Sequence, residues 1–464
     1  MPTESESPGH VKSQDQWAFY TFFLLIITLP LEATLVLEIG FTVRMSYLVL
    51  IPLIVGMCLH RRSGWPYLNF RSPLTVPIAL YLAAAALSLV VLMIYPPPDV
   101  MLVPELQLRG SKVRGLIQMG FLAFSCLVFF VSFWLCSDAK KLTQAVYLHL
   151  IAAAALSLYG IYQVFAHRND FPFVDITNAI GTGGGVYHAA RYVGTGFPFR
   201  AHGTFQEPLN FGHYLLSALP LGLALVVTPA NGDSRSRFWP GWWYVVVYLM
   251  FVAIALTRSR GSWLGLLAAI LTLLVCFEGK LRSRLIRVSV IGGVLMVFAL
   301  WFSLPFTPET AEQFAVANRM DLQHFKDELR FRILPFTLSL FLKHPVLGVG
   351  LGSYPLYQAA HLGSNVLGTA FGVFWQSLVE TGVIGFAAFV AVLVRLYHLM
   401  IRGWGRSRGG PWQPYLLGYL ASFAGLMVQH LSFGDRLTFY TWFLMGVAVS
   451  TVRLVESGSE SAGR

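Results

Sequence analysis

The sequence contains little charge. Asp, Glu, Lys and Arg together make up 12% of its 464 residues, whereas hydrophobic residues make up 56%. Soluble domains carry about 25% charged residues, so this composition excludes a soluble globular enzyme and a disordered chain. The long apolar runs predict a polytopic helical membrane protein, because a membrane β-barrel would show only alternating segments of about ten residues.

Cysteine is scarce as well. The four cysteines lie within or at the ends of apolar runs and show no C-x-x-C spacing, so we interpret them as small core residues and not as disulfides or zinc ligands. They are Cys58, Cys126, Cys136 and Cys276. The 33 basic residues exceed the 22 acidic ones by 11. No basic run is long enough for a nucleic-acid site, and this excess is typical of cytoplasmic loops beside anionic lipids.

Apolar windows of about 20 residues predict an all-α polytopic membrane protein with about twelve transmembrane helices. The windows lie at 17–37, 44–60, 73–95, 115–136, 142–166, 209–228, 242–257, 261–278, 286–304, 371–394, 412–430 and 437–455. The weakest are the first window, which Pro30 and Glu32 interrupt, and the close pair that meets at Arg258.

Basic residues mark one side of the predicted membrane. They lie in the short loops after the second, fourth, sixth, eighth and tenth windows, and the positive-inside bias makes that side cytoplasmic. The expected layout is then a cytoplasmic tail at 1–16, five helices within 17–166, an extracytoplasmic Gly/Arg loop at 167–208, a large extracytoplasmic loop at 305–370, three helices within 371–455 and a cytoplasmic tail at 456–464. Within the large loop, apolar residues recur at helical spacing over 309–343 and predict an amphipathic helix.

The first candidate motif runs from Arg200 to Asn210 and has the sequence RAHGTFQEPLN. It follows a glycine-rich stretch that contains Arg191 and in which backbone amides can approach an anion closely. Arg200 offers a planar fork for phosphate oxygens, and Glu207 and Asn210 are further candidates for substrate binding. The alternative is an ordinary turn whose arginine reaches lipid phosphates.

The second motif has the sequence LTRSRGSWLG and runs from Leu256 to Gly265. It places Arg258 and Arg260 between two apolar windows, and charges at membrane depth are costly and usually functional. If the segment is helical, the two arginines point to nearly opposite faces. The alternative is a tight hairpin at the membrane interface.

The third motif is HPVLGVGLG, from His344 to Gly352, with Arg330 and Arg332 before it. Pro345 must end a helix, and the glycine run lacks the strand-then-helix setting of a dinucleotide site. His361 follows in the same predicted loop. A lone histidine is more often structural than catalytic, but cations near it would favour the neutral form that a general base requires.

The fourth motif, WQSLVETGVIG, runs from Trp375 to Gly385 and places Glu380 about ten residues into an apolar window. A buried carboxylate is costly unless it is paired. We expect an arginine from the other motifs as its partner, in either a functional or a purely structural ion pair.

In order along the chain, these four motifs resemble those of the O-antigen ligase and polymerase superfamily of bacterial membrane glycosyltransferases. The matching patterns are R-x-x-G-T-F-x-x-P, L-T-x-S-R-G-x-W-L-G, H-P-V-x-G-x-G after an arginine, and E-x-G-x-x-G, and they define an expected catalytic region at 195–390. Many members place His-Asn nine residues before the glutamate, where this chain has Phe371 and Gly372. The role of catalytic histidine therefore passes to His361 or to another histidine of the outer loops.

The resemblance implies a glycan donor on undecaprenyl diphosphate and a glycan or lipid-linked acceptor. It also implies a protein of the bacterial cytoplasmic membrane, with its active site on the extracytoplasmic side. Arg200, Arg258 and Arg260 would hold the diphosphate, and His361 would act on the acceptor hydroxyl with Glu380 or Glu207 behind it. Because arginines suffice for the leaving group and no carboxylate pair stands in an outer loop, we expect neither a metal nor a cofactor. Two other classes stay open, namely a transporter and a non-catalytic scaffold in polysaccharide assembly.

Overall fold

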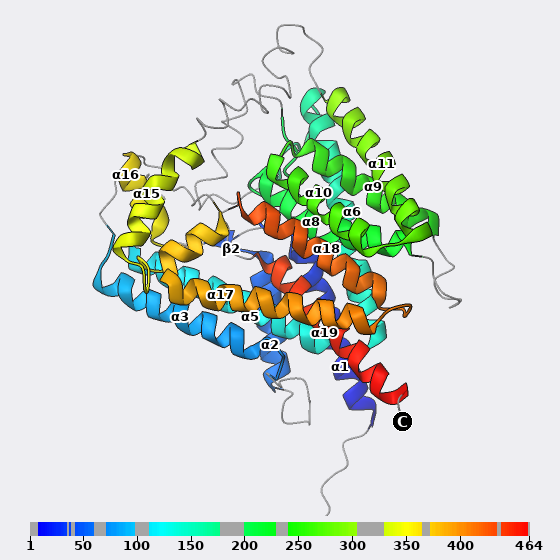
Figure 1. Ribbon diagram of the computed structural model, residues 1–464, viewed down its shortest axis with the longest axis horizontal. Coiled ribbons are helices and arrows are strands. Elements are labelled where there is room, and N and C mark those ends of the chain that lie inside the picture. The colour runs from blue at the N-terminus through cyan, green and yellow to red at the C-terminus, as the bar shows by residue number, and fades with distance from the viewer. Residues whose placement is uncertain are drawn as a thin grey trace, which may run out of the picture.

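The computed structural model describes most of the chain (Figure 1). The described residues are 8–34, 37–38, 42–59, 71–97, 111–176, 199–228, 240–303, 329–363, 372–433 and 438–462. Arg191 and most of the expected amphipathic segment 309–343 lie outside them. Helix α15 covers the end of that segment, but the side chains of Arg330 and Arg332 are not among those described.

Helices make up nearly all of the described structure. They are α1 (Pro8–Thr28), α2 (Met45–Leu59), α3 (Thr75–Ile94), α5 (Ser111–Leu135), α6 (Ala139–Arg168), α8 (Pro208–Val227), α9 (Pro240–Leu256), α10 (Arg260–Cys276), α11 (Gly279–Phe302), α15 (Leu329–Lys343), α16 (Tyr354–Leu362), α17 (Val373–Arg406), α18 (Gln413–His430) and α19 (Phe439–Ala462). Within the described residues, β structure is limited to one antiparallel pair, β1 (Leu37–Glu38) with β2 (Thr42–Val43).

Each of the twelve apolar windows overlaps one helix. By length and composition, six of the described helices could cross a membrane, namely α3, α5, α6, α8, α11 and α17. The protein is thus a multi-pass helical membrane protein as predicted, while the number of about twelve spans stays a prediction. Helices α9 and α10 have 17 residues each, which gives a length of about 26 Å, close to the thickness of a bilayer core.

The first window and its helix differ at both ends. Helix α1 begins at Pro8, inside the segment expected to be a tail, and it ends at Thr28, before the end of the window at 37. The early end has a local cause, because a proline disfavours helical geometry in the residue before it, and Pro30 follows closely.

Helix α18 lies at the centre of the packing, between α8 and α10 on one side and α17 on the other (Figure 1). Helix α19 packs on α5 and α17, and α3 lies along α17. At one end of the bundle the first turns of α8 and α10 meet the last turn of α18. We call this end the motif end, because the first two sequence motifs lie there.

The topology predicts which loops face outward. A cysteine in place of Ser364, in the predicted outer loop, should react with a membrane-impermeant thiol reagent in intact spheroplasts. A cysteine in place of Ser283, which is exposed on α11 near the basic loop, should react only after permeabilisation. Because native Cys58 is exposed, the experiment requires a cysteine-free background. The reverse labelling pattern would invert the proposed orientation.

Candidate active site

The first two motifs lie against each other. The backbone N–H of Ala201 donates to the carbonyl of Leu256 at 3.0 Å, and Nε of Arg200 donates to the carbonyl of Thr257 at 2.9 Å. Two segments more than fifty residues apart in sequence are thereby joined. The half-buried guanidinium of Arg200 lies beside the turn that carries the other two arginines.

Gln163 of α6, which we did not predict as a site residue, fixes the turn of the first motif through hydrogen bonds to its backbone. Its Oε1 accepts hydrogen bonds from the N–H groups of His202 (3.2 Å) and Gly203 (2.7 Å), and its Nε2 donates to the carbonyl of Gly203 at 3.0 Å. The Gln163 side chain is fully buried. A buried amide that satisfies three backbone contacts fixes the loop more firmly than solvent-exposed contacts would.

The second motif forms a tight turn between α9 and α10, as the hairpin alternative predicted. Arg258 adopts a left-handed backbone conformation with φ +48°, which costs a non-glycine residue about 1–2 kcal/mol. Its buried guanidinium donates to the carbonyl of Ser303 (3.1 Å) and to its hydroxyl (2.9 Å), at the end of α11. The Ser259 hydroxyl caps α10, and Arg260 begins that helix.

The last turn of α18 completes the motif end. Nε2 of Gln429 donates to the carbonyl of Leu209 at 2.9 Å and to the hydroxyl of Ser262 at 3.1 Å, so a single buried side chain joins α8, α10 and α18. Of the predicted substrate-binding residues here, Glu207 is exposed at the N-cap of α8, and Asn210 is half-buried in its first turn.

The third and fourth motifs form a second group. Helix α17 is interrupted at Gly382, whose φ of 64° and ψ of −171° are not helical. A break of this kind leaves backbone carbonyls without helical partners. The loop of the third motif supplies them, because the N–H groups of Val349 and Gly350 donate to the carbonyls of Val379 (2.9 Å) and Glu380 (3.1 Å).

The close approach of these two segments explains a glycine of the third motif. A Cβ atom on Gly348 would lie 2.4 Å from the carbonyl carbon of Glu380, and its φ of +73° is itself strained for other residues. On the other side of the break, the N–H of Val383 donates to the carbonyl of Pro345 at 2.9 Å.

The carboxylate of Glu380 is fully buried and faces the first turn of α16. Its Oε2 accepts from the N–H of Gly352 at 3.0 Å and its Oε1 from the N–H of Tyr354 at 3.2 Å, and the Gln376 amide lies 3.4 Å away. We expected an arginine partner, whereas the contacts that the structure describes for the two oxygens are amides. The N-terminus of a helix stabilises a negative charge in the same way as a cation does.

Helices α15 and α16 pack together near this loop. The hydroxyl groups of Thr337 and Tyr354 lie 2.7 Å apart, and burial raises the pKa of the Tyr354 phenol above its usual value, so the tyrosine stays neutral. His361 is exposed on the last turn of α16, and its ring stacks on Phe336 at 4.0 Å. His344 is half-buried just after α15.

The structure therefore does not bring all the predicted catalytic residues together. Arg200, Arg258 and Arg260 lie at the motif end, whereas α16 with His361 lies at the left edge of the molecule, apart from α8 and α10 (Figure 1). The described ring contact of His361 is with Phe336 and not with an arginine. Within the described part of the chain, no three His, Cys, Asp or Glu side chains converge as metal ligands.

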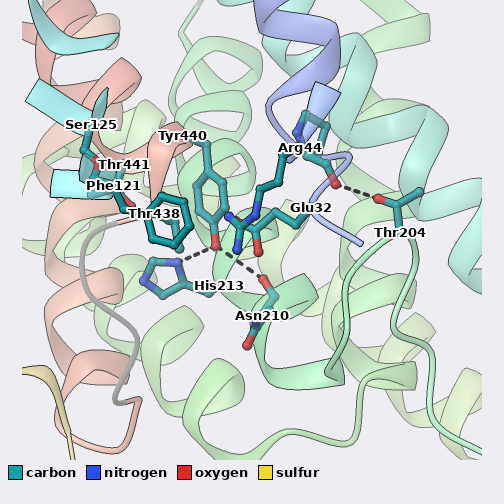
Figure 2. A network of polar contacts seen from close by, with 11 residues as sticks. Glu32, Arg44, Phe121, Ser125, Thr204, Asn210, His213, Thr438, Tyr440 and Thr441 are labelled. Atoms are coloured by element: carbon teal, nitrogen blue, oxygen red, sulfur yellow. Dashed lines mark hydrogen bonds and ion pairs between the residues drawn. The ribbon is translucent and has the colours of Figure 1, made fainter. Parts of the chain in front are cut away.

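A buried polar network behind the motif end was not predicted (Figure 2). The Tyr440 hydroxyl lies 2.8 Å from Nδ1 of His213 and 3.4 Å from the carbonyl of Asn210. Nε2 of His213 lies 3.3 Å from Nε2 of His430. The only sequence signal was that each histidine lies within an end turn of an apolar window.

The loop after α1 borders the same network. Arg44 and Glu32 form an ion pair at 3.4 Å beside Tyr440 (Figure 2). The Thr204 hydroxyl donates to the carbonyl of Pro30 at 2.6 Å, so the N-terminal part of the chain is bound to the first motif.

Residues 245–390 match a family model described as O-Antigen ligase. The match begins in α9 and ends in α17, and it contains the second, third and fourth motifs. It confirms, for this region, the predicted resemblance to the O-antigen ligase and polymerase superfamily. No curated protein matches the chain.

The Glu380 contacts predict a structural effect. Glu380→Ala leaves two buried amides without their acceptor and should destabilise the protein by about 3 kcal/mol, whereas Glu380→Gln, which retains Oε1, should cost less. Thermal unfolding of the purified protein in detergent measures both. Glu456→Ala, which removes an exposed ion pair with Arg406 at 2.6 Å, is the control and should cost less than about 1 kcal/mol. Equal melting temperatures for wild type and Glu380→Ala would contradict the assignment.

Proposed function

We propose that the protein is a membrane glycosyltransferase of surface polysaccharide assembly, which transfers a glycan from undecaprenyl diphosphate to an acceptor hydroxyl. The family match supports an O-antigen ligase-like membrane enzyme. The observation that carries the proposal is the contact of Arg200 with Thr257, because it joins the first motif to the arginine turn of the second.

The diphosphate site in this proposal consists of Arg200, Arg260 and the N-terminus of α10. Two guanidinium groups can hold diphosphate oxygens through charge-assisted hydrogen bonds, and a helix N-terminus adds backbone amides and a favourable dipole. Arg258 has a different task, because its guanidinium is bound to Ser303 and anchors α11. Glu207 and Asn210, in the first turn of α8, are the nearest candidates to contact the sugar.

The proposed reaction is a displacement at the anomeric carbon. The acceptor oxygen forms the new glycosidic bond while the bond from the anomeric carbon to the diphosphate oxygen breaks. Undecaprenyl diphosphate leaves with the electron pair, and the arginines stabilise its charge. The hydroxyl proton passes to a base. His361 is our candidate because its imidazole is exposed, and this role requires that the bound substrates extend from the motif end to α16. His202 is the alternative within the first motif, because its Nδ1–H donates to the carbonyl of Phe205 at 2.9 Å and its Nε2 therefore carries the lone pair that a base needs.

From the sequence we also expect Arg191, Arg330, Arg332, His344 and Glu380 to bind substrate. We retain this role for the three arginines and propose His344 as a second imidazole beside the acceptor. We reassign Glu380 to holding the loop of the third motif, because its carboxylate accepts from the N–H groups of Gly352 and Tyr354. The proposed location is the bacterial cytoplasmic membrane, with both termini cytoplasmic and the motif end extracytoplasmic.

Removal of the arginines tests the diphosphate site. Arg200→Ala and Arg260→Ala should each lower transfer from a purified lipid-linked glycan at least about 100-fold, since each removes a charged contact to the leaving group. The lysine variants should recover only part of the rate, because lysine lacks the bidentate fork. The assay runs in excess chelator. Full activity in both alanine variants, or a wild-type requirement for added Mg²⁺, would contradict the proposal.

Three histidine variants test the base. His361→Ala should lower the transfer rate about 10²–10⁴-fold without weakening donor binding, as expected for loss of a general base. His202→Ala and His344→Ala are the matched comparisons in the same assay. If His361→Ala is as active as wild type and one of the others is not, the role belongs to that histidine.

A further inference from the structure

A chain of buried side chains connects α18 and α19 to the first turn of α8. His213 lies in α8 one turn after Asn210, His430 ends α18, and Tyr440 lies at the start of α19. The side chains of all three are fully buried. Figure 2 shows the Tyr440 hydroxyl between the His213 ring and the Asn210 carbonyl, from which the Asn210 side chain turns away.

The positions of the hydrogen atoms in this series of contacts follow from the donors and acceptors that each group has. The Asn210 carbonyl only accepts, so the Tyr440 hydroxyl donates to it, and Nδ1–H of His213 then donates to the Tyr440 oxygen. Nε2 of His213 is thereby left as an acceptor, and Nε2–H of His430 donates to it. Both imidazoles are neutral in this arrangement.

The reverse direction is disfavoured. It would leave the contact between Tyr440 and Asn210 without a hydrogen, and it would place a hydrogen on Nδ1 of His430. That nitrogen is buried and has no hydrogen-bond partner in the described structure. A buried N–H without a partner is rarer and costlier than an unused acceptor, so the hydrogen bonds run in one direction from His430 to Asn210.

The His430 end of this series of hydrogen bonds is fixed by further contacts. The Phe433 ring packs on His213 with ring centroids 4.7 Å apart and on His430 at 5.8 Å. The carbonyl of Phe433 accepts from the N–H of Val373, the first residue of α17. The position of His430 is thus tied to α17 and that of Asn210 to the motif end.

We propose that His213, His430 and Tyr440 are positioning residues, which set the first turn of α8 relative to the diphosphate site. This inference rests on the proposed function. The three side chains are buried, so they act through the backbone of Asn210 and leave its side chain for the substrate. Misplacement of a reacting group by about 1 Å can cost a factor of about 100 in rate.

Tyr440→Phe tests the proposal, because it removes only the hydroxyl. We expect kcat for glycan transfer to fall about 10- to 100-fold, with the donor KM changed less than about threefold. Tyr214→Phe is the matched control, since that hydroxyl is buried nearby on α8 and has no hydrogen-bond partner in the described structure. It should leave kcat unchanged. Wild-type kcat in Tyr440→Phe would overturn the proposal.

A second pair of variants separates positioning from simple packing. His430→Gln retains an N–H donor toward His213, whereas His430→Leu has none. Only the glutamine variant should therefore retain a kcat close to that of wild type. Equal loss in both would indicate a packing role and overturn the proposal.

Hydrogen–deuterium exchange of the peptide that covers 207–212 gives a readout independent of activity. Exchange should be faster in Tyr440→Phe than in wild type or Tyr214→Phe. If wild type transfers no glycan but this difference in exchange is seen, the proposed function fails, while the positioning of the first turn of α8 by His213, His430 and Tyr440 stands. If exchange is the same in all three proteins, the positioning role fails whatever the activity.

Discussion

Backbone groups at the ends and breaks of helices inside an apolar bundle must find partners, because lipid offers no water to satisfy them. This constraint governs the whole arrangement of the motifs. Gln163 satisfies the turn of the first motif, Gln429 joins the ends of α8 and α10, and Glu380 satisfies the start of α16 beside the break in α17. Each of these side chains is buried, so each is committed to one geometry.

The sequence predicted those features that depend on residues close together along the chain. A helix that faces lipid needs about 20 apolar residues, and each predicted window overlaps a helix. The hairpin at Arg258 was foreseeable because two charged residues separate two apolar runs. Helix α1 ends at Thr28, just before Pro30, the residue at which the sequence already indicated an interruption of the first window.

The rest of the site depends on contacts between distant segments. Gln163, His213 and His430 are polar residues inside apolar windows, and periodicity alone cannot tell which of them meet. The amide partners of Glu380 were not predicted for a related reason. A charge count suggests a cation for a buried carboxylate, whereas the fold provides the amides of Gly352 and Tyr354. The partial positive charge of a helix N-terminus comes from backbone amides, so no charged residue in the sequence marks it.

The central claim is that Arg200 and the N-terminus of α10 bind the diphosphate of a lipid-linked glycan. The most direct measurement is an experimental structure of the wild-type protein in a lipid nanodisc with undecaprenyl diphosphate bound. We expect density for the two phosphates between the guanidinium groups of Arg200 and Arg260, at the first turn of α10. Density for the diphosphate at another position, for example beside α16, would contradict it.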